Sequence, residues 1–233
     1  MMLSDNIRDV VEITGALRKT NRKFCIVGGA ISSFYLEDNV SAKIRPTKDV
    51  DCVIEVLDYL SFTDLEKSLT TLGFIHDLDS GVICRWKYGE ITVDIIPSES
   101  EKILGFTNIW YKDGMKNSLS KQIGGVTIYY FPLSYYIASK IEAFKNRGHH
   151  DYYSSNDFED IVLILEGRRN LNEFYEFPDE IIIYLRREFG IMIKDTKFES
   201  AVYGHLEQTP VIQKRFERII GFLKEFVKSE SAE

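Results

Sequence analysis

Two glycines and two aspartates in the first quarter of the chain have the types and spacing that chemistry on phosphates requires. Gly28 and Gly29 follow a short apolar run, and Asp49 and Asp51 lie two residues apart at the start of another. Because glycine has no Cβ, the backbone at such a turn can approach a phosphate closely. The N–H groups of a helix beginning at Ala30 can then bind the anion. This pattern predicts a site for a phosphate-bearing substrate.

Three carboxylates are predicted to share that site. Asp49 and Asp51 fall on the same face of a strand, with Cα atoms roughly 6.6 Å apart. Asp94 lies in the alternating segment of residues 91–96, which predicts another strand. A single strand aspartate is more often an edge or turn residue, but three together repel one another unless cations compensate them. Bound Mg²⁺ removes that cost and suits phosphoryl or nucleotidyl transfer.

The first half of the chain alternates between the two kinds of element that must position these residues. Apolar residues recur at helical spacing in some segments, and short apolar runs bounded by Gly or polar residues form others. The predicted helices span residues 4–20, 30–37 and 59–72, and the predicted strands span residues 23–27, 50–56, 74–77, 82–87, 91–96, 120–123 and 126–130. The last two strands form a hairpin that turns at Gly124 and Gly125.

The second half shows helical patterns alone. Predicted helices span residues 133–145, 157–165, 179–189 and 211–227. The change in pattern falls near Pro132, which we take as a domain boundary. We therefore predict an α+β protein, with a mixed-sheet core over residues 1–131 and a helical domain over residues 132–233.

Composition narrows the class of protein. The chain has 233 residues, of which 44% are hydrophobic and 28% charged, as in ordinary globular proteins. A net charge of −7 disfavours a broad nucleic-acid-binding face, although a local basic groove remains compatible with it. No apolar run is long enough for a membrane span, and the N-terminus lacks signal-peptide features, so a cytoplasmic location is expected. The three cysteines, Cys25, Cys52 and Cys84, are expected to be buried free thiols.

Four motifs together resemble a known family. The glycine pair, the Asp49-x-Asp51 strand and Asp94 resemble the nucleotidyltransferase fold of the DNA polymerase β superfamily. The run from Arg45 through Thr47 to Asp51 is similar, more narrowly, to its AbiEii/AbiGii abortive-infection toxin-like branch. Two downstream segments resemble later motifs of that branch: Lys140, Ala143 and Arg147 in one, Asp157 and Asp160 in the other. The resemblance covers roughly residues 24–165, most of the chain.

The resemblance implies a reaction, a set of ligands and partners. A nucleoside monophosphate would pass from an NTP to a hydroxyl, with Mg²⁺ or Mn²⁺ held by Asp49, Asp51 and Asp94. Asp94 would also help to activate the acceptor hydroxyl. The implied nucleotide-binding residues are Gly28, Gly29, Ala30, Arg45, Thr47, Lys140, Arg147, Asp157 and Asp160. The acceptor would be an RNA such as tRNA, or a protein, and a cognate antitoxin would be a further partner.

Two departures from the family pattern weaken its phosphate contacts but remove no metal ligand. Nineteen residues separate Gly29 from Asp49, a longer spacing than is common in the superfamily. Ala30 stands where a serine often follows the glycines, so one side-chain contact to phosphate is missing. Weak nucleotide binding or an altered substrate is compatible with both departures. A small-molecule nucleotidyltransferase of the antibiotic-modifying type and a non-catalytic nucleotide-binding module therefore stay open as alternatives.

Several residues of the second half also allow a structural interpretation. The face of Lys140 and Arg147 suits a polyphosphate, or an ordinary solvated helix. Asp157 suits the site, or the start of a helix, where a carboxylate favours the helix dipole. His149 and His150 lack further ligands that would indicate zinc. The basic residues Arg168, Arg169, Arg186, Arg187, Lys214, Arg215 and Arg218 suit an acceptor-binding surface or solvated helix faces.

Overall fold

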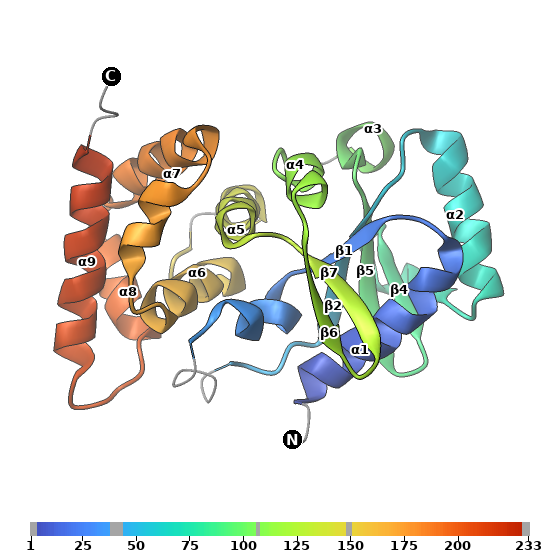
Figure 1. Cartoon of the computed structure of the whole chain (residues 1–233), viewed down its shortest axis with the longest axis horizontal. Coiled ribbons are helices and arrows are strands. Elements are labelled where there is room, and N and C mark those ends of the chain that lie inside the picture. The colour runs from blue at the N-terminus through green and yellow to red at the C-terminus, as the bar shows by residue number, and fades with distance from the viewer. Residues whose placement is uncertain (1–3, 38–43, 106–107, 148–150, 230–233) are drawn as a thin grey trace. The chain divides into compact units, whose positions relative to one another are not determined.

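The computed structural model describes residues 4–37, 44–105, 108–147 and 151–229 (Figure 1). The chain divides into two compact units, which we call the sheet unit and the helical unit. The sheet unit comprises Met1–Ser32 and Arg45–Tyr136, and the helical unit comprises Ser33–Ile44 and Ile137–Glu233. The helical unit thus includes a short segment from early in the chain as well as the C-terminal helices.

The described part of the sheet unit contains a mixed sheet of seven strands in the order β3-β4-β5-β2-β1-β7-β6. Neighbouring strands are parallel at β2/β5 and β1/β7 and antiparallel elsewhere. The strands are β1 (Phe24–Val27), β2 (Asp49–Ile54), β3 (Ile75–His76), β4 (Arg85–Tyr88), β5 (Ile91–Pro97), β6 (Leu119–Ile123) and β7 (Val126–Tyr130). This sheet and the C-terminal helices confirm the predicted α+β class.

The central strands form the core of the sheet unit. All four residues of β1 are buried, as are the last three of β2, because these strands are covered on both faces. The edge strand β6 is largely exposed, and its hairpin with β7 turns at two glycines with φ of 57° and 77°, values that favour glycine. All three cysteines are buried free thiols, as predicted. Burial raises the pKa of Cys25 and of Cys84 to about 12, so both thiols are protonated at neutral pH.

The longer helices of the sheet unit agree closely with the prediction. Helix α1 (Asp5–Leu17) continues into a short 3₁₀ turn, η1 (Arg18–Thr20), and packs its apolar stripe against β7 and β2. Helix α2 (Tyr59–Thr71) begins with a capping box, in which Asp58 and Ser61 bond each other's backbone N–H. The prediction missed α3 (Ser100–Leu104), α4 (Tyr111–Lys116) and the 3₁₀ turn η4 (Leu78–Ser80), because none is long enough to show a periodic pattern.

One element differs in type from the prediction. The helix expected over residues 30–37 is a 3₁₀ helix, η2, that spans Gly29–Tyr35. Its sequence contains two serines and two aromatic residues, which have modest α-helical propensity, and 3₁₀ geometry is common in pieces this short. The helix dipole of a seven-residue 3₁₀ helix attracts an anion less strongly than that of the α-helix expected there. Any phosphate contact at this turn therefore depends mainly on its backbone N–H groups.

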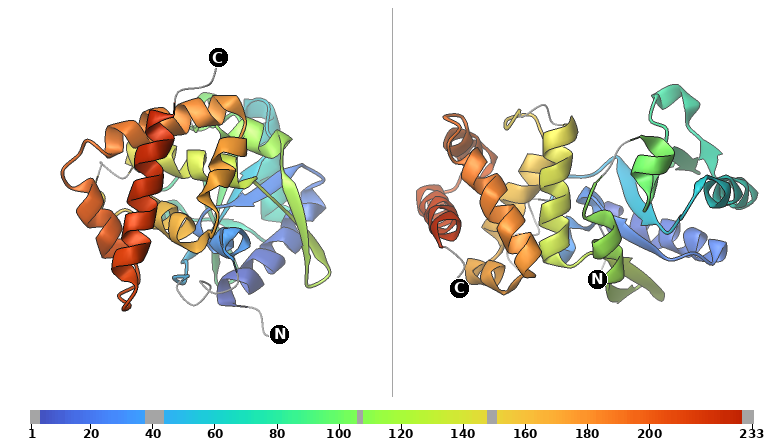
Figure 2. Two further views of the ribbon diagram at one scale, coloured as in Figure 1. Left: turned by 60° about the vertical axis from the view of Figure 1, so that its left-hand side comes forward. Right: turned by 90° about the horizontal axis from the view of Figure 1, so that it is seen from above.

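The helical unit is held together by aromatic side chains. Its elements are α5 (Leu133–Arg147, which begins in the sheet unit), α6 (Asn156–Gly167), the 3₁₀ turn η5 (Leu171–Glu176), α7 (Asp179–Met192), α8 (Phe198–His205) and α9 (Ile212–Lys228). Figure 2 shows α7 in orange and α9 in red, and these two helices pack together. Rings of Phe144, Tyr152, Phe158 and Phe198 contact one another, and Phe174 contacts Phe222 and Phe226 on α9. The prediction missed η5 and α8.

Among the described residues, the structure contains no helix with the length and apolar character needed to span a bilayer.

Candidate functional site

The register of the central strands brings the three predicted carboxylates together. Asp51 pairs with Asp94 across the parallel strands β2 and β5, and Asp49 pairs with Thr92 two positions away. Because directly paired residues project from the same face, and residues i and i+2 share a face, all three aspartates lie on one face of the sheet. Asp49 and Asp51 are partly exposed, whereas Asp94 is buried with 6% of its surface accessible.

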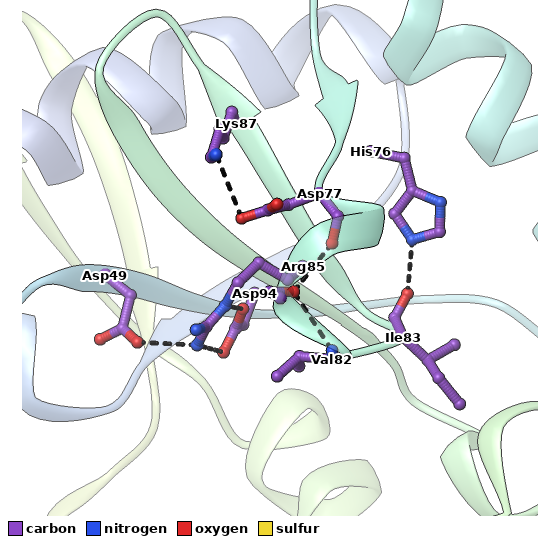
Figure 3. A network of polar contacts seen from close by, with 9 residues as sticks. Asp49, His76, Asp77, Val82, Ile83, Arg85, Lys87 and Asp94 are labelled. Atoms are coloured by element: carbon purple, nitrogen blue, oxygen red, sulfur yellow. Dashed lines mark hydrogen bonds and ion pairs between the residues drawn. The ribbon is translucent and has the colours of Figure 1, made fainter.

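A guanidinium that the sequence prediction did not include also lies on this face (Figure 3). Arg85 donates from Nε to Asp94 Oδ1 and from Nη2 to Asp94 Oδ2, each at 2.8 Å. The same Nη2 lies 3.0 Å from Asp49 Oδ2. Hydrogen bonding to Asp94 raises the pKa of the Arg85 guanidinium further above its usual range, although partial burial opposes it. One cation thus compensates two of the three predicted metal ligands.

The β4/β5 hairpin places Arg85 beside Asp94, and its register could have been read from the sequence. Tyr88 pairs with Ile91 across a two-residue turn, so Arg85 pairs with Asp94 three positions further along each strand. Gly89 in that turn has φ 57°, as a two-residue hairpin turn requires. The short connection between the predicted strands over residues 82–87 and 91–96 therefore contained the signal for the ion pair.

The glycine turn lies directly against Asp51. Gly28 has φ +75°, and a Cβ built on it would lie 1.9 Å from Asp51 Oδ2. The turn is also held by the buried Tyr136, whose hydroxyl donates to the Gly28 carbonyl at 3.2 Å and lies 2.8 Å from Ser32 Oγ. The sequence prediction did not identify Tyr136, which follows the last strand by several residues. Glycine is needed at position 28 for both backbone conformation and space.

We predict that Gly28→Ala destabilises the chain by about 1–3 kcal/mol more than Gly81→Ala does. Gly81 has a similar φ of +69° but nothing within 4 Å of the added Cβ, so it reproduces the backbone strain without the contact to Asp51. Urea unfolding of the two variants measures the difference in the free energy of unfolding. Equal losses of stability in the two variants would show that the Asp51 side chain moves away from the added Cβ without a cost in free energy.

The predicted nucleotide-binding residues Arg45 and Thr47 lie in the segment that leads into β2. Asn6 of α1 holds this segment, since its Nδ2 donates to the Arg45 carbonyl and its Oδ1 accepts from the Thr47 N–H. These bonds, at 3.2 and 3.1 Å, fix the backbone just before Asp49. The side chains of Arg45 and Thr47 are partly exposed.

The other predicted nucleotide-binding side chains form a compact ionic cluster in the helical unit. Lys140 Nζ on α5 lies 3.2 Å from Asp157 Oδ1 and 2.6 Å from Asp160 Oδ2, both on α6. These three side chains are no more than 7% exposed. Arg147 binds Asp157 from the surface through two hydrogen bonds of 2.8 and 3.0 Å. The four residues that resemble two separate family motifs thus meet one another in the fold.

The charges in this cluster compensate one another. Burial on its own raises the pKa of the Asp157 carboxyl, but the Lys140 ammonium and the Arg147 guanidinium outweigh burial and lower the pKa below its ordinary value of 3.8. Ser155, not Asp157, caps α6, and its side chain accepts from the Phe158 N–H. Asp157 lies in the first turn, where its charge also favours the helix dipole.

The arginines considered as an acceptor-binding surface mostly bind neighbours within the helical unit. Arg168 pairs with Glu173, Arg169 with Glu37, Arg187 with Glu188, and Arg215 with Glu166 and Glu207. Arg186 and Arg218 donate to backbone carbonyls. These contacts agree with the structural interpretation of the basic residues.

Two further expectations concern metal ligands. His149 and His150 lie outside the described residues. Among the residues that the structure does describe, no group of three His, Cys, Asp or Glu side chains is arranged to hold a metal ion. Asp49 on β2 and Asp94 on β5 bind Arg85 instead.

Comparison with known proteins gives similarity in structure only. No protein-family model matches the sequence, and no curated protein matches it. One similar solved structure is that of an antigenic nucleotidyltransferase-like protein from Paracoccidioides brasiliensis, at 19% identity and a TM-score of 0.48 over 85% of this chain and 93% of that one. Another is that of the antibiotic-resistance factor ANT(2'')-Ia, at 13% identity and a TM-score of 0.44 over 81% of this chain and 93% of that one. Likeness at this level does not establish an activity.

Proposed function

We propose that this protein is a metal-dependent nucleotidyltransferase that moves a nucleoside monophosphate from an NTP to a hydroxyl. The observation that carries the proposal is the placement of Asp49, Asp51 and Asp94 on one face of adjacent strands, beside the Gly28 turn. Carboxylates gathered in this way are costly unless cations compensate them. A backbone turn without a Cβ beside them offers the close approach that a polyphosphate needs.

The three aspartates are of a type that binds divalent cations, but in this structure two of them bind the Arg85 guanidinium. Carboxylate oxygens are the donors that Mg²⁺ and Mn²⁺ prefer, and Asp49 is 32% exposed on its side chain, which leaves it accessible from solvent. Arg85, however, binds both Asp49 and Asp94. Full use of the three carboxylates as ligands therefore requires the guanidinium to move away from Asp49.

The residues of this chain would divide the work as follows. The Gly28 turn, with Gly29 and Ala30, would hold phosphate oxygens through backbone N–H groups, while Asp49, Asp51 and Asp94 would hold the cation. When bound, the cation would polarise the reacting phosphoryl group and lower the pKa of the acceptor hydroxyl. The acceptor oxygen forms a bond to the α-phosphorus, the bond to pyrophosphate breaks, and a carboxylate takes the proton. Asp94 can take it only after its hydrogen bonds to Arg85 are released.

Lys140 remains a proposed contact of the triphosphate, together with Arg147, Asp157 and Asp160. Its ammonium is buried between two carboxylates in the helical unit, so reaching a phosphate would require those ion pairs to open. A structural role for the cluster accounts for the same residues without that rearrangement.

We expect Arg85→Gln to bind Mn²⁺ more tightly than the wild type does, because it removes a cation that competes for Asp49 and Asp94. Without metal, the variant should lose about 2 kcal/mol, since the buried Asp94 loses its charged partner, which is itself 25% exposed. Adding Mn²⁺ should therefore raise the melting temperature of Arg85→Gln more than that of the wild type. Thermal unfolding in EDTA and in Mn²⁺ measures both effects.

Lys87→Gln is the matched control for this comparison. Lys87 lies two residues further along β4 and pairs with Asp77, not with the three carboxylates. Its removal should leave the Mn²⁺ shift unchanged. The same Mn²⁺ shift in Arg85→Gln and wild type would contradict a metal site at these aspartates.

The arrangement around Arg85 also favours a second candidate, a non-catalytic nucleotide-binding module. Here the guanidinium would permanently take the place of a metal ion. Calorimetry with Mg²⁺ and each NTP, paired with an assay for pyrophosphate, separates the two. NTP binding without pyrophosphate release, with any acceptor supplied, would support the module.

The acceptor class is a further part of the proposal. Transfer to an RNA end such as tRNA, or to a protein, would suit a toxin with a cognate antitoxin. Transfer to a small hydroxyl compound such as an antibiotic would suit the small-molecule alternative. Labelled NTPs incubated with total RNA, cell protein and a panel of small hydroxyl compounds identify both the donor and the acceptor. Label in none of these fractions would contradict the transferase proposal.

A further inference from the structure

The sheet unit contains a second candidate site that is not formed by the three aspartates. A cavity of about 710 Å³ opens among the segments around β1, the ends of β2 and β5, helix α4 and strand β7. Its volume lies within the range of small-molecule binding pockets. All of its lining residues belong to the sheet unit.

The cavity lies at the opposite end of the strands from the carboxylates. Lys23 and Phe24 line it where β1 begins, whereas Gly28 follows the end of that strand. Glu55 lines it just beyond the end of β2, and Asp51 lies near the start. The path along the strand from Asp51 to Glu55 is about 13 Å. A ligand in the cavity therefore need not touch the aspartates.

The lining is basic in a protein that is acidic overall. Arg18, Arg22, Lys23, Lys112 and Lys116 line the cavity, against two glutamates, while the whole chain has a net charge of −7. A concave surface with one sign of charge attracts ligands of the opposite sign. This concentration of cations is the first indication of an anionic ligand.

Internal contacts leave most of these charges uncompensated. One glutamate, Glu99, pairs with Lys112 at 3.0 Å, and with Lys102 outside the lining. Arg22 donates to the backbone carbonyls of Glu55 and Ser61, which fix its position, and its charge also acts on the Asp58 carboxylate outside the lining. The side chains of Arg18, Lys23 and Lys116 make no hydrogen bond or ion pair with any described residue.

The floor and wall of the cavity add apolar and aromatic surface. Phe24 is buried at 5% exposure, Met115 is partly exposed, and the Tyr129 ring is 46% exposed. Such a surface can pack against the flat or apolar part of a ligand, while the surrounding cations bind its charged part. A bare inorganic anion would contact the cations but not the apolar and aromatic surface.

We propose that this cavity binds a small phosphorylated organic molecule, with its phosphates among Lys23, Lys116 and Arg18 and its organic part against Tyr129. A nucleoside polyphosphate has this chemistry. The site is separate from the proposed transferase site and does not depend on it.

Calorimetry of the full chain with ATP in EDTA tests the proposal, with Asp51→Asn introduced to weaken the transferase site. We expect one ATP per chain, with binding that weakens as salt is added. The double variant Lys23→Gln/Lys116→Gln should weaken binding at least tenfold, because each lysine would lose a charged contact with phosphate. Lys194→Gln, an exposed lysine of the helical unit, is the matched control and should bind ATP as before.

Three outcomes would overturn the proposal. One is the absence of ATP binding at millimolar concentration, and another is equal affinity in the double variant and the control. The third is equal affinity for inorganic tripolyphosphate and ATP, which would show that the organic part is not recognised. Because the assay omits divalent metal and uses Asp51→Asn, failure of the transferase proposal leaves these outcomes unchanged.

Discussion

Asp51→Asn is expected to lower nucleotidyl transfer on the order of 100-fold or more, because it removes one charged cation ligand from the centre of the carboxylate set. Asp51 pairs with Val27 on one side and Asp94 on the other, and its carboxylate lies against Gly28. Asparagine has nearly the same volume, so it fits against the turn and keeps the strand register. Loss of charge, rather than loss of fold, should therefore account for the effect.

The measurement is pyrophosphate release from the NTP and acceptor that the labelling experiment identifies. Asp79→Asn serves as the control. Asp79 is exposed in η4, and its substitution makes the same change in net charge as Asp51→Asn. A circular-dichroism melt of both variants checks the fold. Full activity of Asp51→Asn would exclude the proposed cation site, whereas equal losses in both variants would point to a general effect of charge.

Lys140→Met is expected to destabilise the chain by about 3–5 kcal/mol, the range found when one partner of a buried ion pair is removed. Methionine fills similar space but leaves Asp157 and Asp160 buried without the ammonium between them. Urea unfolding measures the loss. Lys224→Met is the control, because Lys224 and its partner Glu199 are both nearly half exposed, and such pairs contribute little.

A second substitution distinguishes lost charge balance from lost packing. Asp160→Asn in the Lys140→Met background removes one of the buried charges and should restore part of the stability. No recovery in the double variant would indicate that the side-chain packing of Lys140, rather than its charge, stabilises the helical unit. A KM for NTP that rises in the active, folded fraction of Lys140→Met would support the proposed triphosphate contact.

The pH dependence of the Lys140→Met loss has a definite sign. The pKa of Asp157 is lowered in the folded protein, so its ion pairs stabilise the wild type above the unfolded value near 4 and stop doing so as the pH falls through the folded value. Without Lys140, burial favours the neutral carboxyl. The difference in stability between wild type and variant should therefore be full at pH 7 and shrink as the pH falls toward and below about 4, because the carboxyl takes up its proton earlier in the variant than in the wild type. A difference that is constant from pH 7 to pH 3 would contradict the ionic explanation.

Local pattern was sufficient to predict much of the sheet unit. The two-residue period of a strand places Asp49 and Asp51 on one face, independently of the tertiary structure. The glycine pair predicts a turn with no room for a side chain. The predicted long helices and the strands match the structure within a few residues. Short elements such as α3, α4 and α8 were missed because fewer than about three turns give no reliable period.

The sequence by itself determined which residues can do chemistry and which strands present them, because those properties depend on residue type and local spacing. Only the tertiary structure decided what meets those residues. The pairing of β4 with β5 brings Arg85 to Asp94 and Asp49, and the packing of α5 on α6 brings Lys140 to Asp157 and Asp160. The basic cavity likewise joins five separate segments of the chain. Such contacts depend on register and packing between distant segments, and a residue's own neighbours in the sequence do not determine them.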